Sequence, residues 1–118
     1  MVKAGAVPTV LLADDEDGVR QGLARALEEA RYRVVQAMDG QSALDHLRRQ
    51  SHKIHVVVTD IRMPRFSGYQ LADWMAVWDY QHPIIFISDC GQGDSTWPGP
   101  LLCKPFPSLP SDPMRRAI

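Results

Sequence analysis

The chain has 118 residues, of which 45% are hydrophobic, enough for one compact domain over residues 1–118 with a core of its own. Its 13 lysines and arginines stand against 14 acids, so it lacks the basic excess of nucleic-acid-binding proteins, and direct contact with nucleic acid is not expected. The apolar run before the first acids is too short for a secretory signal or a membrane span, which predicts a soluble, cytoplasmic domain without membrane insertion.

The cysteines and histidines are not spaced as metal ligands. Cys90 and Cys103 form no CxxC pair, and no two of the four histidines stand four residues apart, as two ligands on one helical face would. We therefore expect structural cysteines with reduced thiols, and surface histidines.

Apolar runs and amphipathic stretches alternate along the first half of the chain. Residues 9–13 form a mainly apolar run that ends in acids, as a strand buried on both faces of a parallel sheet does. From Asp17 to about Arg31, apolar residues recur every three or four positions, which predicts an amphipathic helix with Arg20 among the charged residues off its apolar face. Residues 32–37 indicate a second strand.

The alternation continues through the middle of the chain. A second helix is expected where Asp39 and Gly40 end the second strand. Its apolar face carries Ala43, Leu44 and Leu47. Residues 54–59 are rich in β-branched side chains and predict a third strand that ends at an acid, Asp60.

A third helix and two further strands complete the pattern. Ser67 is placed to cap this helix, and its apolar stripe is expected to face the core. The stripe consists of Leu71, Trp74, Met75 and Trp78. A fourth strand over residues 84–87 delivers Ser88 at its carboxyl end, and a weak fifth strand over residues 101–103 delivers Lys104. Strands that alternate with helices predict an α/β fold with a parallel sheet between helical layers.

The notable polar residues all follow predicted strands. They are Asp14, Asp15, Asp60, Ser88 and Lys104. Ligands of an open parallel sheet bind outside the carboxyl ends of its strands, so we expect these side chains to share one shallow pocket. Two carboxylates about 4 Å apart repel by roughly 4 kcal/mol at an effective dielectric of 20, so three together need either a cation or raised pKa values. Mg²⁺ is the predicted cofactor because it prefers carboxylate and phosphate oxygens.

These motifs, taken in order, resemble the receiver domain of response regulators and hybrid histidine kinases. The resemblance covers about residues 9–106 and rests on Leu11 to Glu16, Thr59 to Pro64, Gly68, Ser88, and Lys104 to Phe106. Each segment alone is a weak indication, whereas the whole ordered set is specific. The resemblance implies a flavodoxin-like three-layer sandwich with five parallel strands in the order 2-1-3-4-5.

The resemblance also implies a role for each residue of the pocket. Asp60 would be a carboxylate nucleophile that accepts a phosphoryl group from a histidine kinase or a histidine phosphotransfer protein. Lys104 would offset charge on the transferred group, and Ser88 would hydrogen-bond it. The Mg²⁺ ligands would be Asp14, Asp15, Asp60 and the backbone carbonyl of Arg62. Such a domain promotes its own phosphorylation and turns over no external substrate, so we do not expect an enzyme.

The chain departs from the family pattern after the fourth strand. Only eleven residues, Asp89 to Gly99, separate the last two predicted strands, so the fourth helix is expected to be absent or one turn long, as in receivers of hybrid histidine kinases. Leu101 stands where the family usually has an aromatic switch residue. Asp89 replaces a small residue, which we expect to slow phosphorylation or shorten the life of the phosphorylated state. The tail after Phe106 has room for only a short helix. Either the chain is cut from a longer protein, or another chain covers the sheet face that this helix leaves open, and exposed apolar surface there favours association, for example as a homodimer.

Two other functions are compatible with parts of this pattern. One is a pseudo-receiver, an interaction module of the same fold that no longer accepts phosphoryl groups. The other is a metal-dependent phosphatase-like enzyme with an aspartate nucleophile. The second is disfavoured because Arg62 stands where such an enzyme has a further acid, two positions after Asp60.

Overall fold

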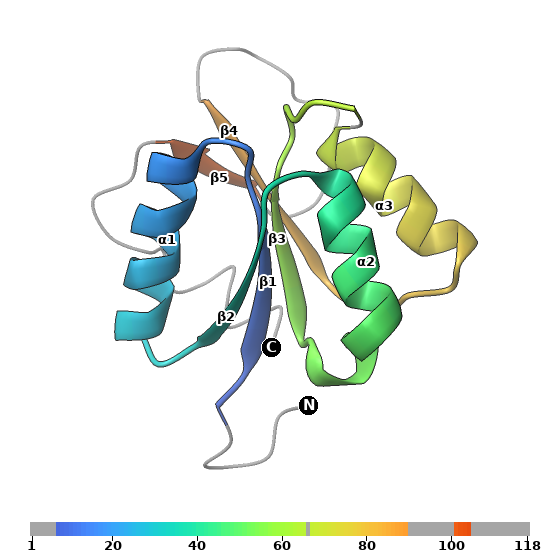
Figure 1. The fold of residues 1–118 in the computed structure, drawn as a ribbon, viewed down its shortest axis with the longest axis horizontal. Coiled ribbons are helices and arrows are strands. Elements are labelled where there is room, and N and C mark those ends of the chain that lie inside the picture. The colour runs from blue at the N-terminus through green and yellow to red at the C-terminus, as the bar shows by residue number, and fades with distance from the viewer. Residues whose placement is uncertain (1–6, 66, 90–100, 105–118) are drawn as a thin grey trace.

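The computed structural model describes residues 7–65, 67–89 and 101–104, in which helices lie on both faces of one parallel sheet (Figure 1). The strands are β1 (Thr9–Ala13), β2 (Arg33–Ala37), β3 (Val56–Asp60), β4 (Ile84–Asp89) and β5 (Leu101–Lys104). The helices of these residues are α1 (Asp17–Glu29), α2 (Gly40–Gln50) and α3 (Gly68–Val77), with a 3-10 turn η1 (Ser51–Lys53). The strand order β2-β1-β3-β4-β5 confirms the predicted flavodoxin-like topology.

The core has two halves, one on each face of the sheet. Successive side chains of a strand point to opposite faces, so β1 supplies both halves. Leu12 joins the cluster that contains Leu27 of α1, and Leu11 joins the cluster that contains Leu47 of α2 and Leu71 of α3. All five side chains are at most 1% exposed. The sheet therefore forms the middle layer, with α1 on one side and α2 and α3 on the other (Figure 1).

Local sequence explains where the helices begin and end. Asp39 caps α2 by accepting a hydrogen bond from the backbone N–H of Ser42 at 2.7 Å. Ser67 caps α3 as predicted, in a capping box with Gln70. The first helix ends at Glu29, slightly earlier than predicted, and Arg31 then adopts a left-handed backbone with φ of 71°.

The strand ends differ from the prediction by one or two residues. The third strand starts at Val56 because η1 occupies the residues before Ile54, and it includes Asp60 as its last residue. The fourth strand continues through Ser88 to Asp89. The predictions of a shortened fourth helix, of a short last helix and of dimerisation through the tail all lie outside the described residues. Among the described helices, none is long and apolar enough to cross a membrane.

The apolar stripe predicted on α3 is only half buried, so the expectation that all of it faces the core is wrong. Leu71 and Met75 are at most 1% exposed, whereas Trp74 is 45% and Trp78 is 39% exposed. A helix turns by about 100° per residue, which places Trp74 about 80° from the middle of the face that Leu71 and Met75 define. Trp78 follows the last helical residue, Val77, beyond the part of α3 that packs on the sheet.

Candidate acidic site at the strand ends

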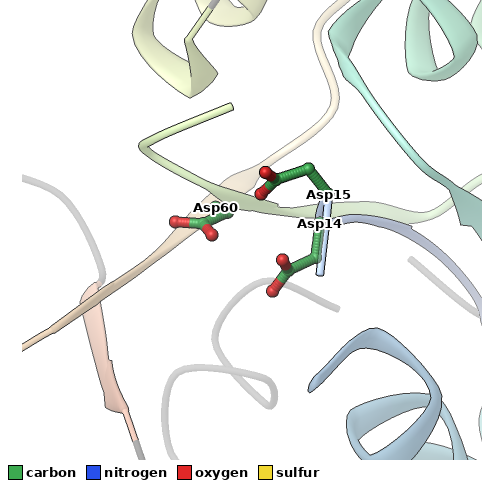
Figure 2. A group of neighbouring side chains, drawn as sticks. All are labelled: Asp14, Asp15 and Asp60. Carbon is green, nitrogen blue, oxygen red and sulfur yellow. The ribbon is translucent and has the colours of Figure 1, made fainter. Parts of the chain in front are cut away.

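Three carboxyl groups meet where β1 and β3 end. These strands are neighbours, with Ala13 beside Thr59, so Asp14 and Asp60 follow at the same level of the sheet. The side-chain oxygens of Asp14, Asp15 and Asp60 can all lie within 4.8 Å of one another. Figure 2 shows the three carboxyl groups gathered at this edge. The predicted convergence of these acids is therefore present in the structure.

The acids differ in burial, and backbone donors hold two of them. Asp14 is fully buried and Asp60 is 7% exposed, whereas Asp15 is exposed to solvent. The backbone N–H of Glu16 donates to Oδ1 of Asp14 at 3.0 Å. The backbone N–H of Arg62 donates to Oδ1 of Asp60 at 3.2 Å. These bonds fix the direction of each carboxylate.

The three acids fit a hard divalent cation. Ligand oxygens 2.0–2.1 Å from Mg²⁺ lie at most about 4.2 Å from each other across an octahedron. The oxygens of Asp14, Asp15 and Asp60 are within 4.8 Å of one another, so small rotations of the side chains bring them into that range. One exposed and two buried carboxylates also leave a side open to solvent, as an ion that keeps several waters requires.

Ser88 and Lys104 stand at the same edge of the sheet. Asp60 pairs with Ile87 in the register of β3 and β4, so Ser88 lies one position further along. Lys104 is the last residue of β5 and pairs with Asp89. The backbone thus brings both predicted residues to the end of the sheet where Asp60 lies. Their roles, and that of the Arg62 carbonyl, stay predictions.

Arg20 is a residue of this site that the sequence did not reveal. We expected it on the outer face of α1, but it is only 8% exposed. Its guanidinium donates to the backbone carbonyl of Asp14 at 2.9 Å, to Oε1 of Gln36 at 3.1 Å and to Asp17 at 2.6 Å. The sequence signal that could have pointed to Arg20 is its position, six residues after Asp14. Arg20 therefore ties α1 and β2 to the backbone of an acid of the site.

Gly68 holds the other side of the site. Its backbone N–H donates to the carbonyl oxygen of Ile61 at 2.8 Å, which joins the first turn of α3 to the end of β3. A Cβ on Gly68 would overlap the carbonyl oxygen of Asp60, and it would lie 3.2 Å from the carbonyl carbon of Asp60 and from Ile61 Cα. Glycine is therefore required for this close approach.

Comparison with known proteins places this chain in one family. The model of the response regulator receiver domain matches residues 10–96. Response regulator RR06 of Streptococcus pneumoniae is 38% identical over 87 residues, which are 74% of this chain and 38% of RR06. Sensor kinase CckA of Brucella abortus is 42% identical over 80 residues, 68% of this chain and 8% of the kinase. This chain thus spans well under half of either relative.

Solved structures agree with the sequence matches. The crystal structure of the receiver domain from the hybrid histidine kinase CckA superposes with a TM-score of 0.70 at 31% identity. The superposition covers 83% of this chain and 86% of that domain. The match therefore extends over most of both chains.

Proposed function

Since this chain belongs to the family of response regulator receiver domains, we propose that it accepts a phosphoryl group from a phosphohistidine onto Asp60. We propose further that residues 1–118 form a single receiver domain. The observation that carries the assignment is the meeting of three carboxyl groups at the ends of β1 and β3. Asp60 is the acid that ends the third strand, where the family resemblance places the phosphoacceptor.

The transfer is a substitution at phosphorus. A carboxylate oxygen of Asp60 forms the new O–P bond while the P–N bond to the donor imidazole breaks. The imidazole leaves with the electron pair of that bond and takes up a proton. The hydrogen bond from the Arg62 N–H orients the Asp60 carboxylate for this attack.

The resemblance assigns the transferred group two further partners on neighbouring strands. Ser88 would donate a hydrogen bond to the phosphoryl group, and the Lys104 ammonium would offset its charge. Their places in β4 and β5, at the edge of the sheet where Asp60 lies, support these roles. The alignment of three neighbouring strand ends is thus what the proposed chemistry requires.

We assign Mg²⁺ as the cofactor of this reaction. Its ligands would be Asp14, Asp15, Asp60 and the backbone carbonyl of Arg62. The bound ion neutralises negative charge on the carboxylates and on the phosphoryl oxygens, which otherwise repel each other. The fit of the three carboxyl groups to an oxygen-ligand site supports this assignment.

The proposed donor is a histidine kinase or a histidine phosphotransfer protein. The similarity to a sensor kinase and to the receiver domain of a hybrid histidine kinase supports this class of partner. Phosphorylation would then alter the contacts of the domain with other proteins. Receiver domains are signalling modules, and we assign no turnover of an external substrate to this one.

Intact-protein mass spectrometry after incubation with Mg²⁺ and acetyl phosphate tests the proposal. The wild-type chain is expected to gain about 80 Da, the mass of one phosphoryl group, through covalent carboxylate chemistry. Asp60→Asn removes the nucleophile and should gain nothing. Asp79→Asn is the matched control, because Asp79 is an exposed acid beyond the end of α3, and it should behave as the wild type.

Each other outcome identifies a different function. A folded, Mg²⁺-binding wild type that forms no adduct, even with a phosphorylated histidine donor, would refute phosphoryl acceptance and favour the pseudo-receiver. Sustained release of phosphate from an ester, lost in Asp60→Asn, would favour the phosphatase-like enzyme.

A further inference from the structure

A buried hydroxyl, that of Thr59, stands directly before the proposed phosphoacceptor in β3. The three residues that precede it in the strand are valines, and threonine has the shape of valine with a hydroxyl in place of one methyl group. Thr59 is 0% exposed, and its neighbours in the sheet, Ala13 and Phe86, are apolar and equally buried. Burying a hydroxyl among apolar groups is unfavourable unless it is hydrogen-bonded. Its use therefore lies in the groups that it contacts.

The Thr59 hydroxyl donates to the backbone carbonyl oxygen of Asp60 at 3.0 Å. The N–H of the same peptide group, which belongs to Ile61, donates to the carbonyl oxygen of Ile87 at 3.2 Å. A peptide group is planar, so bonds to its oxygen and to its N–H together fix its orientation. The peptide group that follows Asp60 is thus held from two sides.

The same hydroxyl contacts the loop that follows the acceptor. Oγ1 of Thr59 lies 3.9 Å from Sδ of Met63, and Met63 itself packs against the core on the side of α2 and α3. A hydroxyl has one proton to donate and a thioether is a weak acceptor, so the Met63 contact is mainly packing. Arg62 lies between Asp60 and Met63, the two residues that Thr59 contacts, and its N–H donates to Oδ1 of Asp60 at 3.2 Å.

We propose that Thr59 is a positioning residue for the phosphoryl transfer, an inference that rests on the proposed function of Asp60 as the nucleophile. By holding the peptide group after Asp60, Thr59 sets the place of the Arg62 N–H and so the direction of the attacking carboxylate. A small misplacement of a nucleophile slows its reaction strongly. Gly68 leaves room for the Asp60 carbonyl oxygen, whereas Thr59 gives that oxygen a hydrogen bond.

Two substitutions separate positioning from stability. Thr59→Val keeps the shape but loses the hydroxyl, whereas Thr59→Ser keeps the hydroxyl but loses a buried methyl group. Both variants should melt below the wild type, because each loses a buried contact. With acetyl phosphate and Mg²⁺, at a temperature where thermal unfolding shows all proteins folded, Thr59→Val should form the adduct about fivefold or more slowly. Thr59→Ser should react at the wild-type rate despite its lower stability.

The matched control is the same substitution at the opposite end of the sheet. Thr9 is 7% exposed and begins β1, so Thr9→Val should leave the rate unchanged. A series of Mg²⁺ concentrations then distinguishes an effect on the nucleophile from an effect on the ion. The slower rate of Thr59→Val should persist at saturating Mg²⁺, because the hydroxyl acts on the direction of the Asp60 carboxylate.

Three results would overturn the inference while leaving phosphoryl acceptance intact. They are equal rates in Thr59→Val and the wild type, a rate in Thr59→Ser as slow as that in Thr59→Val, and a slow rate in Thr59→Val that saturating Mg²⁺ restores. A wild type that forms no adduct with acetyl phosphate or with a phosphorylated histidine donor refutes the proposed function itself, and with it the reaction that Thr59 would serve.

Discussion

Gly68→Ala should damage both the fold and the phosphoryl site, because the added methyl group collides with the backbone of Asp60. The new Cβ would overlap the Asp60 carbonyl oxygen. The two atoms must separate by roughly 1 Å to reach the ~3.3 Å of an ordinary C···O contact. The obstacle is backbone at the end of a buried strand, so no side chain can rotate away to relieve it.

The expected cost lies at the upper end of the range for overpacking, about 2–3 kcal/mol. For a domain of this size that lowers the midpoint of thermal unfolding by roughly 10 °C. Moving the Asp60 backbone by a fraction of an ångström also misplaces its carboxylate, so phosphorylation should slow about tenfold or more while the protein is still folded.

Circular dichroism melting and the rate of adduct formation with acetyl phosphate measure the two effects separately. Gly22→Ala is the matched control, because a Cβ there meets nothing within 4 Å. Gly22 lies inside α1, where alanine should raise stability by about 0.5–1 kcal/mol and leave phosphorylation unchanged. An unchanged melting midpoint and rate in Gly68→Ala would refute the proposed contact.

Three further changes probe the site and the helix that carries it. Arg20→Met removes the guanidinium donor from the buried carbonyl oxygen of Asp14, so it should cost about 2 kcal/mol in urea unfolding and weaken Mg²⁺ binding in a calorimetric titration. Wild-type values for both would contradict the role of Arg20. Asp89→Ala removes a negative charge at the end of β4, which we expect to repel the incoming phosphoryl group, so the variant should form the adduct severalfold faster. An equal or slower rate would refute this repulsion. Ser67→Ala removes the cap of α3 and should cost about 1 kcal/mol, seen as a melting midpoint about 4 °C lower; an unchanged midpoint would contradict the cap.

The sequence predicted the sheet and the acidic cluster because both depend on local order along the chain. Apolar runs of strand length predicted the strands, and Asp14 directly follows one strand while Asp60 ends another. Parallel strands bring their carboxyl ends to one edge, so the meeting of Asp14 and Asp60 followed from the alternation of strands and helices. The strand order came from the family resemblance, since periodicity alone does not decide which strands are neighbours.

The sequence missed features that depend on how elements pack against each other. Arg20 looks like a surface residue on a helical wheel, and only the placement of α1 beside β2 brings Gln36 and the Asp14 carbonyl within its reach. Trp74 and Trp78 have the spacing of core residues, yet the sheet covers only the narrower face that Leu71 and Met75 define. A pattern of apolar residues gives the direction of a helical face but not its width.

The two backbone contacts at the strand ends link the site to both faces of the sheet. Arg20, from α1 on one face, holds the Asp14 carbonyl, and Gly68, from α3 on the other face, packs against the Asp60 carbonyl. A shift of either helix therefore moves a carboxylate of the site. Coupling of this kind is reciprocal. We therefore expect a ligand that draws Asp14 and Asp60 together to shift the positions of α1 and α3. The first turns of these helices, rather than the acids themselves, are where we expect phosphorylation to change the surface that a partner protein meets.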